Sequence, residues 1–202
     1  MFTADQATQL VQDLVRIGIN GVGPLSSAKD LAEEYKHGYE SVDDAINALI
    51  RWEASKSFGY GFVTGLGGLV TLPVTLPANL FATWAVQVRL VGAIAELKGH
   101  DSSCSRVQTM VILILVGDPI KELARHMMMD VGKKLTQQLI KQIPAAALRE
   151  INKQVGFRLL TKAGSTGVVN LTKAVPLIGG LVGGGVDAYA TNAVGDLAHE
   201  RL

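Results

Sequence analysis

Apolar residues recur at helical spacing through the first fifty positions of the chain. The first set is Ala7, Leu10, Val11, Leu14 and Ile17. This i, i+3, i+4, i+7 pattern predicts an amphipathic helix of about 15 residues, which ends at the breaker cluster 18–24. A second, short helix is expected between a cap at Ser26 or Ser27 and the region of Gly38. A third helix is expected to begin at the capping-box sequence 41–44.

The next 32 residues, 57–88, carry no charge. Their length would allow a membrane span, but five glycines and two prolines interrupt them, and a helix that continues through both prolines is unfavourable. We therefore expect a glycine-rich helix to about Val70 and a second helix from Pro77 to Lys98. Because the second helix has so few charges, it must be surrounded by protein or by lipid.

Short apolar runs and helix breakers predict further helices in the middle of the chain. Residues 99–101 end the preceding helix, and Asp101 or Ser102 is expected to cap the next one. The uncharged run 107–116 is too short to cross a bilayer and favours a buried helix, with a strand as the competing interpretation. Helical spacing resumes over 119–139.

The last third of the chain continues the helical pattern. Pro144 is expected to start or kink a helix, and the sequence 164–166 is expected to cap a short one. Pro176 then opens a final glycine-rich helix, in which Gly179 and Gly183 lie one turn apart and permit close approach of another backbone. Since no series of strands appears, we predict an all-α fold, a compact bundle of about 8–9 helices with glycine-rich central helices.

The composition argues against several classes of function. Hydrophobic residues make up 48% of the 202 residues and charged residues 18%, and the formal net charge is +1. A disordered chain is excluded, and nucleic-acid binding through bulk positive charge is not expected. The single cysteine forbids an internal disulfide and favours a reducing compartment. We expect no signal peptide, because the first 20 residues carry acidic residues in an amphipathic pattern.

Motifs for catalysis are absent or weak. The chain has no phosphate-binding loop and no nucleophile elbow, so we expect no cofactor and, on balance, no enzymatic activity. Cys104 is interpreted as a small residue at a helix start. Three acid–histidine sets resemble the elements of a di-iron bundle site, but ordinary pairing on solvated helix faces is favoured and no metal is expected. The sets are Glu34 with His37, Asp196 with His199, and Glu122 with His126 and Asp130.

Arg89 is the first charge after the uncharged stretch and lies on an otherwise apolar helix. A buried arginine needs an anionic partner or several acceptors. Asp118 and Asp187, each beside another apolar run, are the expected partners. A structural ion pair is favoured over contact with a polar headgroup or a ligand.

Four segments in the same order resemble the EcsC family of bacterial proteins. They are 61–69, 72–80, 87–101 and 170–198, within a similar stretch that runs from about residue 43 to 197. The family is named for a gene beside an ABC transporter. The resemblance implies a helical bacterial protein of the cytoplasm or of the inner face of the membrane, and it supplies no set of catalytic residues.

These observations predict a helical extension over residues 1–40 and an EcsC-like domain over 41–202. The leading hypothesis is a non-enzymatic protein of the membrane face, or a binder of hydrophobic ligands, accessory to a membrane or transport process. Its expected partner is a membrane surface, an integral membrane protein or an apolar small molecule, not a nucleic acid, and a homo-oligomer is left open. The expected location is cytoplasmic or peripheral on the inner membrane face.

Two alternatives stay open. One is a soluble immunity or resistance factor that sequesters an apolar toxin or antibiotic between its helices. The other is a metal-dependent enzyme that uses the acid–histidine pairs. The candidate contact residues for a membrane or ligand are Gly61, Gly65, Trp84, Gln87, Arg89, Gly179 and Gly183.

Overall fold

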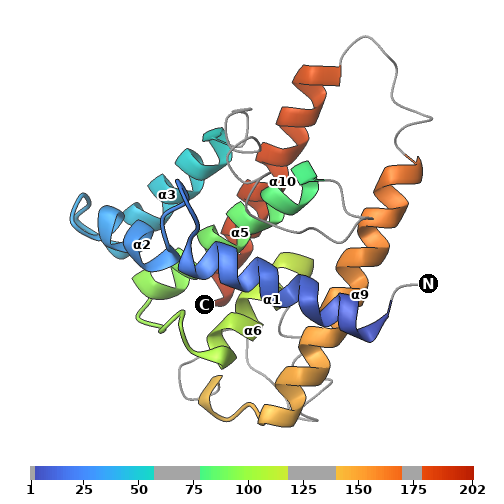
Figure 1. Ribbon diagram of the computed structural model, residues 1–202. Helices are drawn as coiled ribbons and strands as arrows, with labels where there is room; N and C mark the ends of the chain where they lie inside the picture. The colour runs from blue at the N-terminus through green and yellow to red at the C-terminus, as the bar shows by residue number, and fades with distance from the viewer. Residues whose placement is uncertain (1–2, 57–77, 118–139, 170–178) are drawn as a thin grey trace.

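The computed structural model describes residues 3–56, 78–117, 140–169 and 179–202, and within these the residues 56, 78–79, 162–169 and 179–187 by their backbone alone. The described ranges form seven α-helices and no β-strand (Figure 1). The helices are α1 (Ala4–Asn20), α2 (Ala28–Lys36), α3 (Val42–Lys56), α5 (Ala78–Leu97), α6 (Ser105–Val116), α9 (Ala145–Val169) and α10 (Gly179–Arg201). The predicted all-α class is therefore confirmed, while the predicted total of 8–9 helices depends in part on segments outside these ranges.

Local side-chain chemistry fixes the starts of the first three helices. Thr3 and Ser27 each form a reciprocal capping box with the residue three positions on. At the start of α3, the Ser41 hydroxyl accepts a hydrogen bond from the Asp44 amide at 3.1 Å and donates one to the Asp44 carboxylate at 2.6 Å. These hydrogen bonds confirm that α2 and α3 are capped. They stabilise the helix starts because they satisfy backbone amides that have no partner within the helix.

Helix α5 lies at the centre of the molecule (Figure 1). Helices α1, α2, α3, α6 and α10 all pack against it, and α9 packs on α1 and α6. Within the part of the chain that the structure describes, α5 is the one helix long and apolar enough to cross a membrane, and 72% of its 18-residue apolar window is buried inside the protein. Other parts of the protein therefore cover most of the apolar surface of α5.

Of four further helix predictions, two are confirmed and two are corrected. The run 107–116 is a helix rather than a strand. Its N-cap is Cys104, without a side-chain cap, and not Asp101 or Ser102. The Asp101 carboxylate instead accepts hydrogen bonds from the amide and hydroxyl of Ser103, at 2.9 and 2.6 Å, which makes a local turn before the helix.

Helix α9 begins directly after Pro144, as expected, but it does not end at residues 164–166. The helical backbone continues to Val169, so the predicted break and new cap at this point are wrong. A single glycine costs a helix only about 1 kcal/mol relative to alanine, which the hydrogen bonds of the continuing turns can offset. The helices predicted before Val70 and over 119–139 lie outside the described residues.

Close helix contacts involve Gly18, which was expected only as part of the breaker cluster 18–24, and Gly156, which the sequence pattern did not single out. At Gly156 of α9, an added Cβ would collide with the main chain of Ala7 in α1. At Gly18 of α1, it would lie 2.6 Å from Val88 Cγ1 and 2.8 Å from the Ala85 carbonyl oxygen, both in α5. Glycine at these positions lets the helix backbones approach to distances that any side chain would prevent.

We expect Gly156→Ala to destabilise the protein by at least ~2 kcal/mol, because the methyl group meets backbone that cannot move aside. Gly38→Ala is the matched control, since the nearest atom to its Cβ is the Tyr35 carbonyl oxygen at 3.9 Å. Urea unfolding followed by circular dichroism measures both variants. Equal stability of the two would show that α1 and α9 do not depend on this contact.

Candidate functional site: an aromatic groove between α2 and α3

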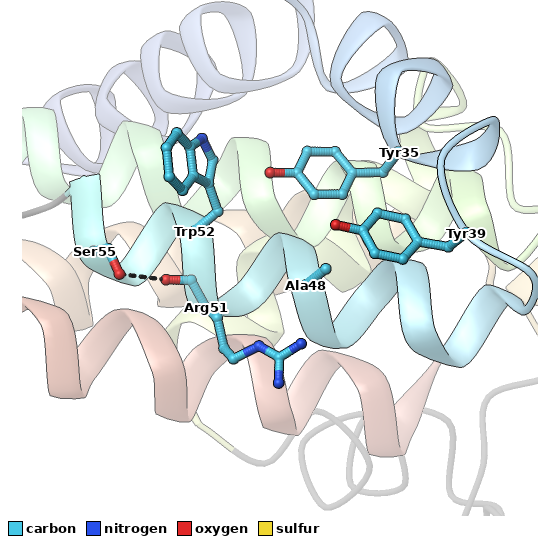
Figure 2. Close-up of a pocket in the computed structure, with 6 residues that line it drawn as sticks. All are labelled: Tyr35, Tyr39, Ala48, Arg51, Trp52 and Ser55. Atoms are coloured by element: carbon cyan, nitrogen blue, oxygen red, sulfur yellow. Dashed lines mark hydrogen bonds between the residues drawn. The ribbon is translucent and has the colours of Figure 1, made fainter.

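A surface groove of about 350 Å³ lies between the end of α2 and the outer face of α3. We call it the aromatic groove, and its lining residues are Tyr35, Tyr39, Ala48, Arg51, Trp52 and Ser55 (Figure 2). Helical spacing places Ala48, Trp52 and Ser55 on one face of α3, while Ile46, Leu49 and Ile50 of the same helix are buried in the core. On the groove side of α3, Trp52 and Ser55 are exposed, and Ala48 is buried at the base of the helix face.

The tyrosines form one wall of the groove. Their rings stack in parallel, with centroids 6.0 Å apart. Tyr35 is anchored, with 8% of its surface exposed, while Tyr39 is 44% exposed and Trp52 54% exposed. Figure 2 shows both phenol hydroxyls directed toward the Trp52 side of the groove. Rigid aromatic side chains with polar edges are the groups that proteins favour at binding surfaces.

A buried ion pair holds α3 in place beneath the groove. Arg89 of α5 donates a hydrogen bond from Nη2 to Glu53 Oε2 at 2.5 Å, and from Nη1 to the Ser26 hydroxyl at 3.2 Å. Glu53 is fully buried and Arg89 is 6% exposed. The favoured structural ion pair is therefore confirmed, with Glu53 as the partner; of the two partners expected from the sequence, Asp118 lies outside the described residues and Asp187 is described by its backbone alone. The sequence pattern missed Glu53 because it lies within an ordinary amphipathic helix.

Burial and nearby charges change the titration of Tyr35. Together they raise its pKa from 10.0 to about 12, with burial of the phenol as the largest cause and the negative charges of Glu53 and Glu34 acting in the same direction. Arg89 opposes this effect in part.

The other predicted contact residues of α5 are buried. Gln87 donates a hydrogen bond to the Thr191 hydroxyl of α10 at 3.3 Å, and Trp84 is 4% exposed in the core. Gly179 and Gly183 lie in the first turns of α10, where only the backbone is described. Gly61 and Gly65 lie outside the described residues. The three candidates on α5 therefore lie in the core rather than on the surface.

The acid–histidine sets within the described residues make ordinary pairs. His37 lies 3.5 Å from Glu33 rather than pairing with Glu34. His199 Nε2 lies 2.9 Å from the Asp43 carboxylate of α3, while Asp196 accepts a hydrogen bond from Asn192. Across the part of the chain with described side chains, no group of three or more histidine, cysteine or acidic residues could hold a metal ion.

The end of α10 is fastened to the segment that follows α5. Lys98 donates a hydrogen bond to the His199 carbonyl at 2.6 Å, and His100 lies 3.5 Å from the Leu202 carbonyl. Burial lowers the pKa of His100, which keeps the ring neutral near physiological pH. These contacts place α10 against α5 and stabilise the fold without forming a polar site.

The protein-family comparison agrees with this helical arrangement. The model of the EcsC protein family matches residues 2–201. This chain belongs to the EcsC family. Searches of the curated proteins and of the solved structures found no match. The match includes α1 and α2, and both of these helices pack against α5; the predicted division of the chain at residue 41 stays a prediction.

The aromatic groove was not among the sequence-predicted sites. Tyr35 and Tyr39 are four residues apart, and Trp52 falls outside the apolar stripe of α3. The one feature of the sequence that could have indicated the groove was Trp52, an aromatic residue outside the core-facing stripe. Spacing along the chain could not place Trp52 next to the tyrosines, because α2 and α3 are separate helices and their packing is known only from the folded chain.

Replacing Arg89 with Met is expected to destabilise this EcsC-family protein by about 3–5 kcal/mol, because Glu53 then stays buried without the arginine. The double variant Glu53→Leu with Arg89→Met removes both charges and is expected to recover much of that loss. Urea unfolding of the two variants gives the comparison. If Arg89→Met lowers the free energy of unfolding by less than about 1 kcal/mol, the ion pair does not have the stabilising role assigned to it, since loss of a buried charge partner costs several times more.

The raised pKa of Tyr35 predicts a stability change at high pH. Between about pH 10 and 12 the folded protein keeps the Tyr35 proton while the unfolded chain loses it, so the free energy of unfolding falls as pH rises through this window. Tyr35→Phe lacks this contribution. We expect urea midpoints of wild type to fall more steeply than those of Tyr35→Phe; parallel curves would contradict the shift.

Proposed function

We propose that this protein is a non-enzymatic peripheral protein of the cytoplasmic membrane face, and that it contacts the bilayer through the aromatic groove and the uncharged segment 57–77 that follows α3. The main observation that supports the proposal is the exposure of Trp52. It is 54% exposed, and it lies on α3 four residues before Lys56, the last charge ahead of the uncharged segment. Tryptophan and tyrosine are enriched where protein meets the bilayer interface, because their rings are apolar and their edges polar.

The distribution of exposed apolar side chains supports this placement. Within the described part of the chain, four large hydrophobic residues are exposed, and three of them lie at the end of α2 and along α3: Tyr39, Val42 and Trp52. The fourth, Tyr189, lies on α10. Tyr39 and Trp52 also line the same groove, and exposed apolar residues that share a surface indicate an interaction site more often than scattered single residues do.

The burial of α5 determines which kind of membrane contact is proposed. Most of the apolar window of α5 packs against other helices, so a span through α5 would require the core to open. Shallow insertion of exposed aromatic residues requires no such rearrangement. We therefore propose peripheral attachment rather than a membrane span through this helix.

Charge favours apolar insertion over electrostatic attraction. Residues 28–55 carry six exposed carboxylates, from Asp30, Glu33, Glu34, Glu40, Asp43 and Asp44, and three exposed cations, from Lys29, Lys36 and Arg51. This excess of negative charge opposes binding to anionic lipids. Attachment through the groove is consequently expected to survive high salt and to be no stronger on anionic vesicles than on neutral ones.

The two tryptophans of the chain provide a direct test. Trp84→Phe leaves Trp52 as the only indole, and Trp52→Phe leaves the buried Trp84. When neutral phosphatidylcholine vesicles are added, we expect the emission of Trp52 to shift to shorter wavelength, as an indole leaving water does. The emission of Trp84 should not change, since this side chain is already surrounded by protein.

Flotation of the same proteins tests attachment itself. We expect wild type to float with neutral vesicles at low and high salt, Trp52→Ala to float at least several-fold less, and Tyr189→Ala, which removes an exposed aromatic residue elsewhere, to float like wild type. Protein that stays at the bottom in every condition, with no shift of Trp52 emission, would overturn the proposal.

A further inference from the structure

The charges of this protein are unevenly distributed along the chain. Residues 1–105 contain seven basic and eleven acidic residues, whereas residues 106–202 contain twelve basic and seven acidic residues. The described surface shows the same division. Residues 28–55 carry six exposed carboxylates and three exposed cations, while residues 140–161 carry four cations and one carboxylate. The small net charge of +1 is therefore the sum of an acidic part and a basic part.

The two charged parts lie on different sides of the fold. Helix α2 packs on α1, α3 and α5, whereas α9 packs on α1 and α6, and Figure 1 shows α2 and α9 at opposite edges of the molecule. The acidic face of α2 consists of its exposed carboxylates, Asp30, Glu33 and Glu34. The basic face of α9 consists of the cations on its solvent side, Arg149, Lys153 and Arg158. Within one copy, neither face can reach the other.

We infer that copies of this protein associate head to tail, with the basic face of one copy against the acidic face of the next. The two faces are complementary in charge, and complementary potentials orient two proteins and accelerate their encounter. Since the net charge is only +1, little overall repulsion between copies opposes this contact.

The spacing of the charges on the two helices matches. Asp30 and Glu34 are four residues apart on α2, and Arg149 and Lys153 are four residues apart on α9. Each pair therefore lies on one side of its helix, about 6 Å apart along the axis. When the two helices lie side by side, both cations of α9 are brought next to carboxylates of α2.

The charges of these faces are only partly compensated within their own helices. Neither Arg149 nor Glu34 has an ion-pair partner among the described residues. Lys153 lies 3.2 Å from Glu150, and both side chains are more than 40% exposed. Exposed pairs of this kind are weak, so Lys153 remains available to a carboxylate of a second copy.

A second copy fits the basic face better than an extended polyanion does. Nucleic acids and anionic membranes are bound through an excess of positive charge, and this chain has a net charge of +1 and six exposed carboxylates over residues 28–55. A second copy presents a small acidic surface to α9 and keeps its own basic side at a distance.

The position of the two faces determines the kind of assembly. Because they lie at opposite edges of the molecule, a closed dimer cannot use both, and each pair of copies leaves one acidic and one basic face free. A contact between two different surfaces extends into longer oligomers or closes into a ring. Since exposed ion pairs are weak and are screened by salt, the association is expected at low salt and high protein concentration.

Sedimentation equilibrium of the full chain measures this association. At about 0.01 M salt, where the screening length is about 30 Å, we expect the weight-average mass to rise with protein concentration beyond that of a dimer. At about 1 M salt the screening length falls to about 3 Å, and we expect the mass of the monomer at every concentration.

Charge reversal on each face tests the pairing. The first variant combines Arg149→Glu with Lys153→Glu, and the second combines Glu33→Lys with Glu34→Lys. Each variant has two faces of the same sign, so each alone is expected to stay monomeric at low salt. A mixture of the two is expected to associate again, because each acidic face then meets a basic one. This recovery also shows that both variants are folded.

The matched control combines Asp196→Lys with Glu200→Lys on α10. Both side chains are exposed, and the net charge changes by the same amount as in the α2 variant. This control is expected to associate like wild type, which separates a loss of the acidic face from repulsion by added charge. Trp52→Ala leaves both faces intact and is also expected to associate like wild type, so the inference does not depend on the membrane proposal.

Three results would overturn the inference: a wild type that stays monomeric at low salt, a mass that stops at the dimer, or a mixture of the two variants that stays monomeric. If wild type is monomeric but floats with anionic vesicles, and the α9 variant does not float, the basic face binds anionic lipid rather than a second copy.

Discussion

Helix α5 can occupy the centre of this protein because the charge of Arg89 is compensated there by Glu53 of α3. A helix that carries so few charged residues must be covered on almost every side, and five other helices cover it. Its arginine would make that burial unfavourable without an anionic partner. The ion pair, together with the Ser26 hydroxyl, therefore joins α5 to α3 and to the start of α2 at one point.

The aromatic groove depends on the same arrangement. Since α3 directs Glu53 and its apolar stripe toward the core, Trp52 and Ser55 on the other side of the helix are left at the surface. Tyr35 is held by the α2–α5 packing and supports Tyr39 through ring stacking. The buried ion pair is thus a structural element, and the groove above it is the surface on which binding is proposed.

Membrane attachment through the aromatic groove uses the apolar area of exposed rings and does not depend on charge. Close contacts at Gly18 and Gly156 keep α1 tightly packed on α5 and α9, which favours binding by exposed side chains over opening of the core.

The sequence by itself determined the all-α class, the EcsC resemblance, a cap at Ser26 or Ser27, the cap at Ser41, and the approximate extent of α5, because these depend on local spacing and on residues next to one another in the chain. It also indicated that Arg89 needs a partner. Tertiary structure alone decided that the partner is Glu53, that α9 continues past residue 164, and that Gly18 and Gly156 are the close contacts. It alone brought Trp52 beside Tyr35 and Tyr39. Each of these features depends on the packing of separate helices or on competition between local and longer-range contacts. The periodicity of one segment carries no information about how helices pack or about which contacts prevail.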